Sequence, residues 1–137
     1  MHRRDFLKAT AQASLSYSAL PLLPSLKRTA PYRLALIGSG WWGGNILRAA
    51  LQHGGCKLIA LCDVDERQLN AAMKALSPLT SDRPKTYRDY RELLQKEKPE
   101  IVIVATPDHW HPLIAIAAMQ QVAHVYVEKS ICHTINE

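Results

Sequence analysis

Residues 33–44 read Arg33-Leu34-Ala35-Leu36-Ile37-Gly38-Ser39-Gly40-Trp41-Trp42-Gly43-Gly44, an apolar run followed by glycines in the spacing G-x-G-x-x-G. A helix-like segment, residues 45–53, comes next, so the order is strand, tight turn and helix. In that order Gly38 turns the chain off the strand, Gly40 lets a pyrophosphate approach the backbone, and Gly43 lets the helix pack closely on the strand. The free N–H groups and the dipole of the helix N-terminus favour a phosphate there. The pattern predicts a dinucleotide site, and the alternative is a structural glycine turn without a ligand.

A carboxylate stands at the expected interval from this glycine motif. A second apolar run, residues 57–62, ends at Asp63, twenty residues after Gly43, where a carboxylate can accept hydrogen bonds from both ribose hydroxyls of an adenosine. No arginine immediately follows Asp63 to offset its charge against a 2′-phosphate, and Arg67 is four residues further on. The sequence therefore predicts NAD as the cofactor in preference to NADP. Trp41 and Trp42, between the glycines, are further candidates for contact with the cofactor.

The charge of the chain is concentrated at its N-terminus. The 137 residues carry a net charge of +5, and residues 1–33 account for all of it, with six basic side chains against Asp5 alone. Residues 34–137 hold eleven basic and eleven acidic side chains, so they lack the basic surplus that nucleic-acid binding needs. The length suits one domain with a sizeable core. The three cysteines form no CxxC pair and give no indication of a disulfide or a metal site.

The first thirty-one residues have the features of an export signal rather than of a fold. Arg3 and Arg4 precede Phe6-Leu7-Lys8, and a weakly apolar stretch rich in Ala, Ser and Leu follows, a pattern that resembles a twin-arginine signal peptide. The stretch contains a glutamine, several serines and two prolines, so it is too polar and broken to span a bilayer. We expect residues 1–31 to be a leader, residues 32–137 to be the folded domain, and the protein to reach the periplasm. The alternative is a disordered basic tail on a cytoplasmic protein.

Apolar runs and helix-like segments alternate over the rest of the chain. The run at residues 101–105, Ile-Val-Ile-Val-Ala, shows no polar alternation, which is typical of a strand covered on both faces. Pro112 stands at a good first-turn position, and the segment after it is apolar nearly all round, so we expect that helix to be buried. Strands separated by helices predict an α/β fold, a doubly wound parallel sheet with right-handed crossovers. The expected strands cover residues 33–37, 57–62, 86–87, 101–105 and 124–127, and the expected helices cover 41–53, 66–76, 89–98 and 112–121.

Two polar clusters follow the last two expected strands. The first is Thr106-Pro107-Asp108-His109-Trp110-His111, and the second is Glu128-Lys129-Ser130. Ligands of doubly wound sheets bind beyond the carboxyl ends of the strands. Both clusters should therefore share an edge of the sheet with the glycine motif.

The two clusters suggest different chemistry. Asp108, His109 and His111 lack a convincing ligand spacing for a metal ion, and no metal is assigned. Lys129 is well placed to donate to a substrate hydroxyl or to relay a proton. The alternative for Lys129 is a surface lysine paired with Glu128.

Together these motifs resemble the Gfo/Idh/MocA family of NAD(P)-dependent oxidoreductases. The similarity rests on GSGWWG, Cys62-Asp63-Val64-Asp65, the run from Ala105 to His111, and Val127-Glu128-Lys129, which occur in that order between Tyr32 and Glu137. It implies an N-terminal Rossmann domain and a C-terminal α/β domain that covers the substrate. That substrate is mostly a sugar, an inositol or a related polyol. Some relatives instead hydrolyse glycosides through a transient oxidation that uses a tightly held NAD.

The resemblance also implies a role for each matching residue. Gly38, Gly40 and Gly43 would meet the pyrophosphate, and Asp63 would bind the adenosine ribose. On the nicotinamide side, Thr106, Pro107 and His111 would form the lining, Glu128 would approach the ribose, and Lys129 would be the catalytic lysine that faces the substrate.

The chain departs from the family pattern in three places. Ser130 stands where the family has a proline that stiffens the turn aiming the lysine. Residues 121–123, Gln-Val-Ala, replace a turn with a glycine, and a branched residue at positive φ there would cost roughly 1 kcal/mol or more. The chain ends at Glu137, just as residues 134–137 begin another helix, so we expect the substrate domain to lie outside it. Alone, the chain is expected to bind NAD without turnover, as a nucleotide-binding fragment, and to be capable of forming a homo-oligomer.

Overall fold

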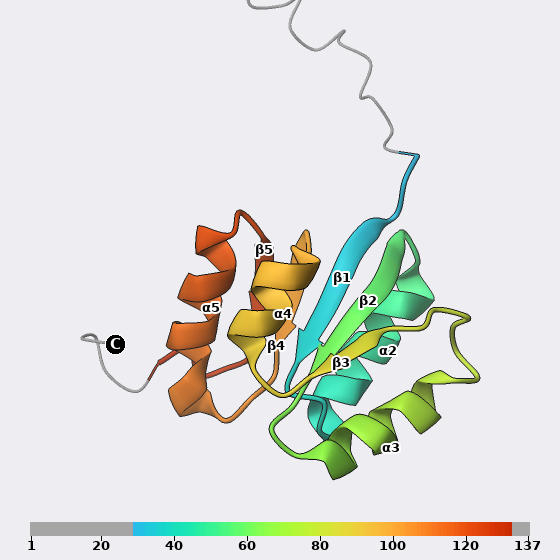
Figure 1. The fold of residues 1–137 in the computed structure, drawn as a ribbon, viewed down its shortest axis with the longest axis horizontal. Helices are drawn as coiled ribbons and strands as arrows, with labels where there is room; N and C mark the ends of the chain where they lie inside the picture. The colour runs from blue at the N-terminus through green and yellow to red at the C-terminus, as the bar shows by residue number, and fades with distance from the viewer. Residues whose placement is uncertain (1–28, 133–137) are drawn as a thin grey trace, which may run out of the picture.

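A computed structural model describes residues 29–132, which form a parallel sheet of five strands. The strands are β1 (Tyr32–Ile37), β2 (Cys56–Cys62), β3 (Lys85–Tyr87), β4 (Ile101–Val104) and β5 (His124–Val127). Their order across the sheet is β3-β2-β1-β4-β5, and each neighbouring pair is parallel (Figure 1). The predicted doubly wound α/β fold is confirmed. Most of the expected leader and the helix expected from residue 134 lie outside the described residues.

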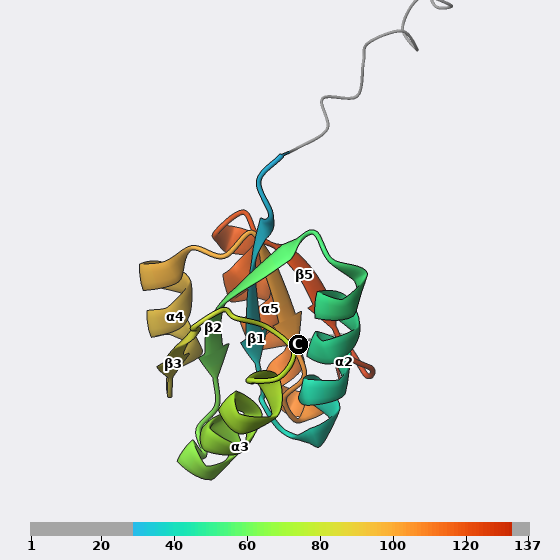
Figure 2. The same cartoon turned by 90° about the vertical axis from the view of Figure 1, so that its right-hand side faces the viewer.

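Helices cover both faces of the sheet. α2 (Trp41–His53) and α3 (Glu66–Leu76) pack on one face, and α4 (Tyr90–Glu97) and α5 (His111–Gln120) pack on the other. Figure 2 shows α2 and α4 on opposite sides of the strands. β1 is the central strand, with β2 and β3 added on one side and β4 and β5 on the other. Successive strands are first added on one side of β1 and then on the other, and doubly wound sheets bind ligands at the point where this change occurs. No described helix is long and apolar enough to cross a membrane.

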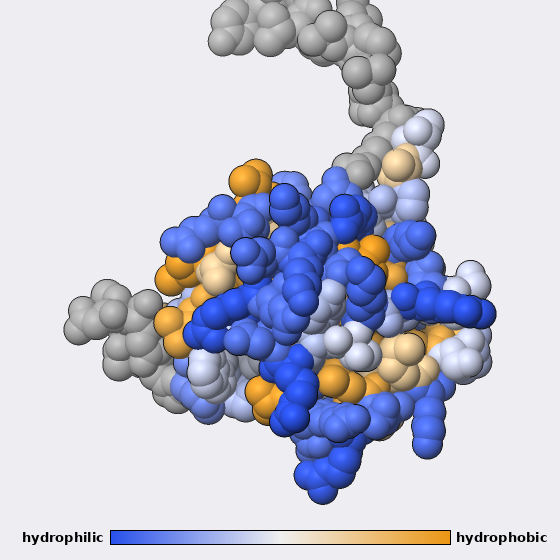
Figure 3. Space-filling model, viewed as in Figure 1, coloured by the Kyte–Doolittle hydropathy of each residue, from blue (hydrophilic) through white to orange (hydrophobic). Residues whose placement is uncertain are grey.

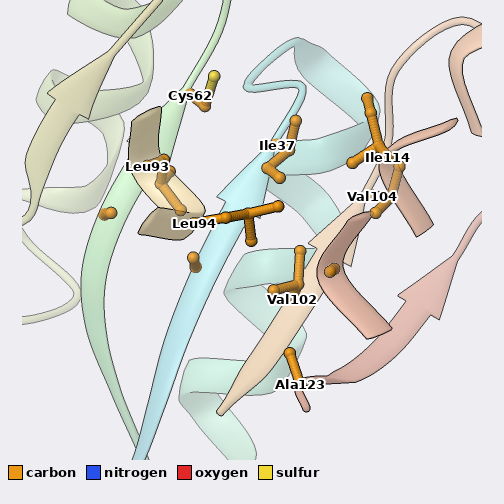
Figure 4. Packing of buried hydrophobic residues seen from close by; sticks show 11 residues of the cluster. Ile37, Cys62, Leu93, Leu94, Val102, Val104, Ile114 and Ala123 are labelled. Carbon is orange, nitrogen blue, oxygen red and sulfur yellow. The ribbon is translucent and has the colours of Figure 1, made fainter. Parts of the chain in front are cut away.

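Burial on both faces explains why the strands lack polar alternation. In β1 the residues from Leu34 to Ile37 are at most 2% exposed, because helices lie on both sides of this strand. Figure 4 shows the cluster on the α4–α5 face, in which Ile37 and Val102 of the sheet pack with Leu93 and Leu94 of α4. A second apolar cluster fills the space under α2 and α3. Packing in these two clusters fixes the positions of the strands, and the candidate site residues lie at the carboxyl ends of those strands.

The ends of the helices follow their capping residues. Asp65 and Asp89 each accept a hydrogen bond from the backbone N–H two residues further on, at 2.9 and 2.8 Å, and so cap α3 and α4. α4 is shorter than expected, because Asp89 is its cap and Lys98 ends it in the left-handed conformation at φ +46. A short 3-10 turn, η2 (Asp108–Trp110), was not expected from the sequence and precedes α5.

The expectation that the helix now labelled α5 is buried is wrong for one of its faces. Ile114 and Ala115 are buried, but Leu113, Ile116 and Met119 are 53%, 43% and 56% exposed. Orange atoms gather over α5 at the left edge of Figure 3. The sheet covers only the inner side of this helix. Self-association through the outer side stays a prediction.

The turn between α5 and β5 carries the strain expected from its sequence. Val122 has φ +62, which confirms the prediction of a branched residue in a conformation that glycine adopts freely. Its side chain is 90% exposed. Burial therefore does not compensate for the strained backbone.

Candidate dinucleotide site

A groove of about 500 Å³ lies at the carboxyl edge of the sheet, where β1, β2 and β4 end. Its volume is in the range of small-molecule sites. The residues singled out from the sequence that line it are Gly38, Gly40, Asp63, Thr106 and Pro107. Because the carboxyl ends of parallel strands meet at one edge, three loops that are far apart in the sequence form one surface.

The three glycines of the motif have different surroundings. Gly38 has φ +92, and a Cβ there would lie 2.5 Å from the carbonyl oxygen of Ala105. A Cβ at Gly43 would lie 2.0 Å from the carbonyl oxygen of Gly38, so the first turn of α2 packs directly on the loop. Gly40 has no heavy atom within 4 Å of its Cβ position and immediately precedes α2. Two glycines are thus required for packing, and the third leaves open space beside a helix N-terminus, which fits a pyrophosphate.

The Asp63 carboxylate joins two loops at this edge. Its Oδ2 accepts hydrogen bonds from the backbone N–H and the hydroxyl of Ser39, at 2.8 and 3.1 Å, and its Oδ1 accepts one from the backbone N–H of Asp65 at 3.0 Å. Ser39 is 4% exposed, so water competes little for these bonds. They hold the carboxylate beside the glycine loop, and its remaining lone pairs fit ribose hydroxyls.

The Thr106 hydroxyl is buried and has no hydrogen-bond partner among residues 29–132. Thr106 lines the groove, and Pro107 beside it is exposed. A buried hydroxyl without a partner costs free energy. A ligand in the groove could supply the missing hydrogen bond, on the side that the resemblance assigns to nicotinamide.

His111 lies behind the groove and is not part of its lining. Its residue surface is 1% exposed. Nδ1 lies 2.7 Å from the carbonyl oxygen of Ser130, and Nε2 lies 2.7 Å from that of Thr106. The structure therefore places His111 between the segments that follow β4 and β5, and its contact with the cofactor stays a prediction.

The two tryptophans of the glycine motif also lie outside the groove lining. Trp41 is 79% exposed and lines a hollow between α2 and α3. Trp42 is half-exposed and lines an apolar hollow together with Tyr126 of β5. Their expected contact with the cofactor stays a prediction.

Glu128 and Lys129, just after β5, differ in their surroundings, and neither lines the groove. Hydrogen bonds from the Trp42 indole and from the Tyr126 hydroxyl, the latter at 2.9 Å, lower the pKa of the Glu128 carboxyl below its ordinary value. The Lys129 side chain is exposed, and its ammonium has no ion-pair partner within the described part of the chain. The pair between Lys129 and Glu128, the alternative interpretation, is not formed.

Several groove residues were given no role from the sequence: Val64, Arg88, Tyr90, Arg91 and Trp110. Arg88 donates from Nη2 to the carbonyl oxygen of Val64 at 3.1 Å. β3 pairs with the end of β2, which brings the loop after β3 beside Asp63. A signal was present, because Arg88-Asp89-Tyr90-Arg91 is a third polar cluster that directly follows a strand.

The described residues contain no group of three His, Cys, Asp or Glu side chains that could hold a metal ion. Cys62 lines the groove. Burial raises the pKa of its thiol to about 12, so the thiol stays protonated at neutral pH. Cys62, Cys56 and Cys132 are free thiols.

Relatives of this chain are found by sequence. The profile of the Gfo/Idh/MocA family, described as an oxidoreductase family with an NAD-binding Rossmann fold, matches residues 32–137. A glycosyl hydrolase family 109 protein from Stenotrophomonas maltophilia is 37% identical over 126 residues. That match covers 88% of this chain and 28% of the relative, so the chain spans less than a third of that protein's length.

Solved structures resemble the fold. Myo-inositol 2-dehydrogenase from Lactobacillus plantarum aligns with a TM-score of 0.67 and 30% identity, over 77% of this chain and 30% of that one. The WlbA dehydrogenase from Bordetella pertussis, in complex with NADH and UDP-GlcNAcA, aligns with a TM-score of 0.64 and 30% identity, over 74% of this chain and 30% of that one. The match across residues 32–137 shows that this chain belongs to the Gfo/Idh/MocA family of oxidoreductases and carries its NAD-binding Rossmann fold.

Proposed function

We propose that this chain binds NAD in the groove, as part of an exported enzyme that acts on sugars or polyols. One observation carries the proposal. The open space at Gly40, directly before the N-terminus of α2, belongs to the same groove as the Asp63 carboxylate. A pyrophosphate at the first position and an adenosine ribose at the second are parts of one dinucleotide. Gly38 and Gly43 hold the backbone that binds the pyrophosphate.

The residues after β4 and β5 bind the nicotinamide half in this proposal. Thr106 and Pro107 form the wall, and the unpaired Thr106 hydroxyl supplies a polar contact. The lowered pKa of Glu128 keeps its carboxylate ionised as an acceptor for the nicotinamide ribose. Bound NAD supplies a hydride acceptor. Lys129, with its exposed side chain, donates a hydrogen bond to a substrate hydroxyl or relays its proton.

Two reaction classes are compatible with this site. The first is oxidation or reduction of a sugar or polyol, which the names of the two solved structures support. The second is hydrolysis of a glycoside through a transient oxidation, which the 37% identity to a glycosyl hydrolase family 109 protein supports. The first class changes the redox state of NAD with each product, whereas the second restores NAD in each turnover. The two classes can be separated with a longer protein that contains this chain, by measuring NADH absorbance while product forms.

Calorimetric titration of the 137-residue chain with NADH tests the cofactor site. Gly40→Ala should weaken binding about tenfold or more, because the methyl group occupies the space for the pyrophosphate. It should leave the fold intact, since no atom lies within 4 Å of that Cβ position. Gly44→Ala is the matched control, because its Cβ position is equally open, and it should keep the NADH affinity. The proposal fails if the wild type does not bind NADH, or if both variants bind it as the wild type does.

The export route is a further part of the proposal. Arg3-Arg4 followed by Phe6-Leu7-Lys8 supports the twin-arginine route. That route carries proteins that fold before crossing the membrane, so a cofactor bound in the cytosol would travel with the protein. Periplasmic location therefore agrees with the proposed NAD site.

A further inference from the structure

We propose that His111 is a positioning residue, which joins the loop after β4 to the turn after β5 and thereby holds the turn that carries Lys129. The inference rests on the proposed function, because it gives this turn a task in binding the nicotinamide half of NAD. His111 itself does not line the groove. It acts through the backbone of two other residues.

The ring of His111 makes one contact in each of the two segments. Its Nδ1 reaches the Ser130 carbonyl oxygen and its Nε2 reaches the Thr106 carbonyl oxygen, both at 2.7 Å. β4 and β5 are neighbours in the sheet, so the ring spans the ends of two adjacent strands. His111 itself is 1% exposed, whereas Ser130 is an exposed residue.

Both partners of the ring are backbone carbonyl oxygens, which only accept hydrogen bonds. Each contact therefore needs a ring N–H as its donor.

The turn at Lys129 needs such a restraint. Ser130 follows Lys129 where the resemblance leads us to expect proline, and a serine leaves φ free. The hydrogen bond to the Ser130 carbonyl restrains the same turn from outside the backbone. The hydrogen bond to the Thr106 carbonyl connects this turn to a residue that lines the groove.

Two substitutions separate the two contacts. Asparagine at this position puts an amide nitrogen near Nδ1, so His111→Asn keeps a donor for Ser130 and loses the one for Thr106. Glutamine puts its amide nitrogen near Nε2, so His111→Gln keeps the donor for Thr106 and loses the one for Ser130. His109→Gln is the control, because its side chain is 62% exposed and does not line the groove.

Calorimetry with two ligands, NADH and ADP, is the test on the full chain. ADP carries the adenosine half only. Both His111 variants should bind NADH about tenfold more weakly than the wild type and ADP with unchanged affinity. Equal losses for both ligands would show a merely structural role and overturn the inference, as would unchanged NADH affinity. His109→Gln should bind both ligands as the wild type does.

If the wild type binds neither NADH nor ADP, the proposed function itself has failed. Ring-nitrogen NMR of the unliganded wild type then still tests His111: ring nitrogens hydrogen-bonded to the Ser130 and Thr106 carbonyls support the bridge, and a ring without these hydrogen bonds overturns it.

Discussion

Single residues in this chain are constrained by the backbone positions that they occupy. Val122 and Lys98 have φ +62 and +46, in the left-handed region where side chains with a Cβ are strained. Position 38 requires glycine for two reasons: its φ is +92, and a Cβ there would clash with the Ala105 carbonyl. The strain at Val122 followed from the sequence, whereas the close approach at Gly38 depends on a residue of another strand end.

Val122→Gly should raise the free energy of unfolding by about 1 kcal/mol, because glycine removes the strain at positive φ and little apolar burial is lost. Urea unfolding followed by circular dichroism measures the change. Gln121→Gly is the control, because Gln121 has φ −90 and the added chain freedom should lower stability. A neutral or destabilising Val122→Gly would mean that this turn is unstrained.

Asp63 should determine the choice between NAD and NADP. Its carboxylate would repel a 2′-phosphate, and Arg67, the next arginine along the chain, is paired with Asp65 at 2.9 Å. We expect the wild type to bind NADH more tightly than NADPH. Asp63→Ala should weaken NADH binding and reduce the preference for NADH over NADPH. Ser39→Ala keeps the carboxylate and the backbone hydrogen bond, so it should keep the preference. Tighter binding of NADPH by the wild type would contradict the expectation.

Between elements, a network of polar side chains connects α4 to the edge strand β3. The Glu97 carboxylate accepts hydrogen bonds from Lys85 Nζ at 2.9 Å and from the Tyr87 hydroxyl, both on β3. The Arg33 side chain of β1 donates to the Glu97 carbonyl. The Glu97 side chain is only 10% exposed. A strand of three residues at the edge of the sheet is thus held by side chains as well as by its pairing with β2.

This network should make stability depend on pH at both extremes. Hydrogen bonds from Tyr87 and Lys85 lower the pKa of Glu97, so its contribution is present above the unfolded pKa and is lost as the pH falls through the lowered folded pKa. The hydrogen bond to Glu97 raises the pKa of Tyr87 to about 12, so that contribution is present below the unfolded pKa and is lost as the pH rises through about 12.

Glu97→Gln should remove both dependences and lower the free energy of unfolding at neutral pH by about 1 kcal/mol or more. Urea unfolding at a series of pH values measures this. Glu92→Gln on the same helix is the control. It breaks an exposed pair with Lys96 and should change stability little. Identical pH profiles for the wild type and Glu97→Gln would show that the network does not contribute.

At the scale of the whole molecule, the candidate site residues lie at one open edge of the sheet. The groove, the Asp63 carboxylate and the exposed Lys129 lie at one edge of the sheet, and the outer face of α5 is apolar and exposed. Gly38, Gly40, Asp63, Thr106 and Pro107, which are predicted to bind the dinucleotide, line one groove. No described element covers the Lys129 side chain.

The 137-residue chain should therefore bind NAD without turning over. Hydride transfer needs the reacting carbon held about 3–3.5 Å from its acceptor, and water around an exposed lysine weakens its interaction with a substrate. NADH absorbance over a panel of sugars and polyols should stay flat. Turnover that disappears in Lys129→Ala would contradict this and show that the chain, or a second copy of it, completes the site.

The leader should direct the whole protein across the inner membrane. Arg3→Lys combined with Arg4→Lys should keep the protein in the cytosol, because twin-arginine export depends on that pair. Cell fractionation with immunoblotting measures the distribution. Lys27→Arg combined with Arg28→Lys changes basic residues outside the motif and should leave export unchanged. If the variant with Arg3→Lys and Arg4→Lys has the same periplasmic fraction as the wild type, residues 1–31 are only a basic tail.

Local patterns in the sequence were sufficient for the fold and for much of the site. Apolar runs, the glycine spacing and the polar clusters at strand ends are properties of neighbouring residues, and they predicted the parallel sheet and the groove around Gly40, Asp63 and Thr106. Strand bounds differed from the expected ones by at most one residue at either end. Contacts between residues far apart in the sequence could not be found in this way.

Tertiary structure alone decided which strand ends lie side by side and what each element leaves uncovered. Pairing of β3 with β2 brings Arg88 to Val64, and pairing of β4 with β5 brings Thr106 and Ser130 to opposite sides of the His111 ring. α5 is apolar all round, yet only the face toward the sheet is buried. The physical reason is the same in each case: a pattern specifies the character of a surface, and the packing of distant elements specifies what that surface meets.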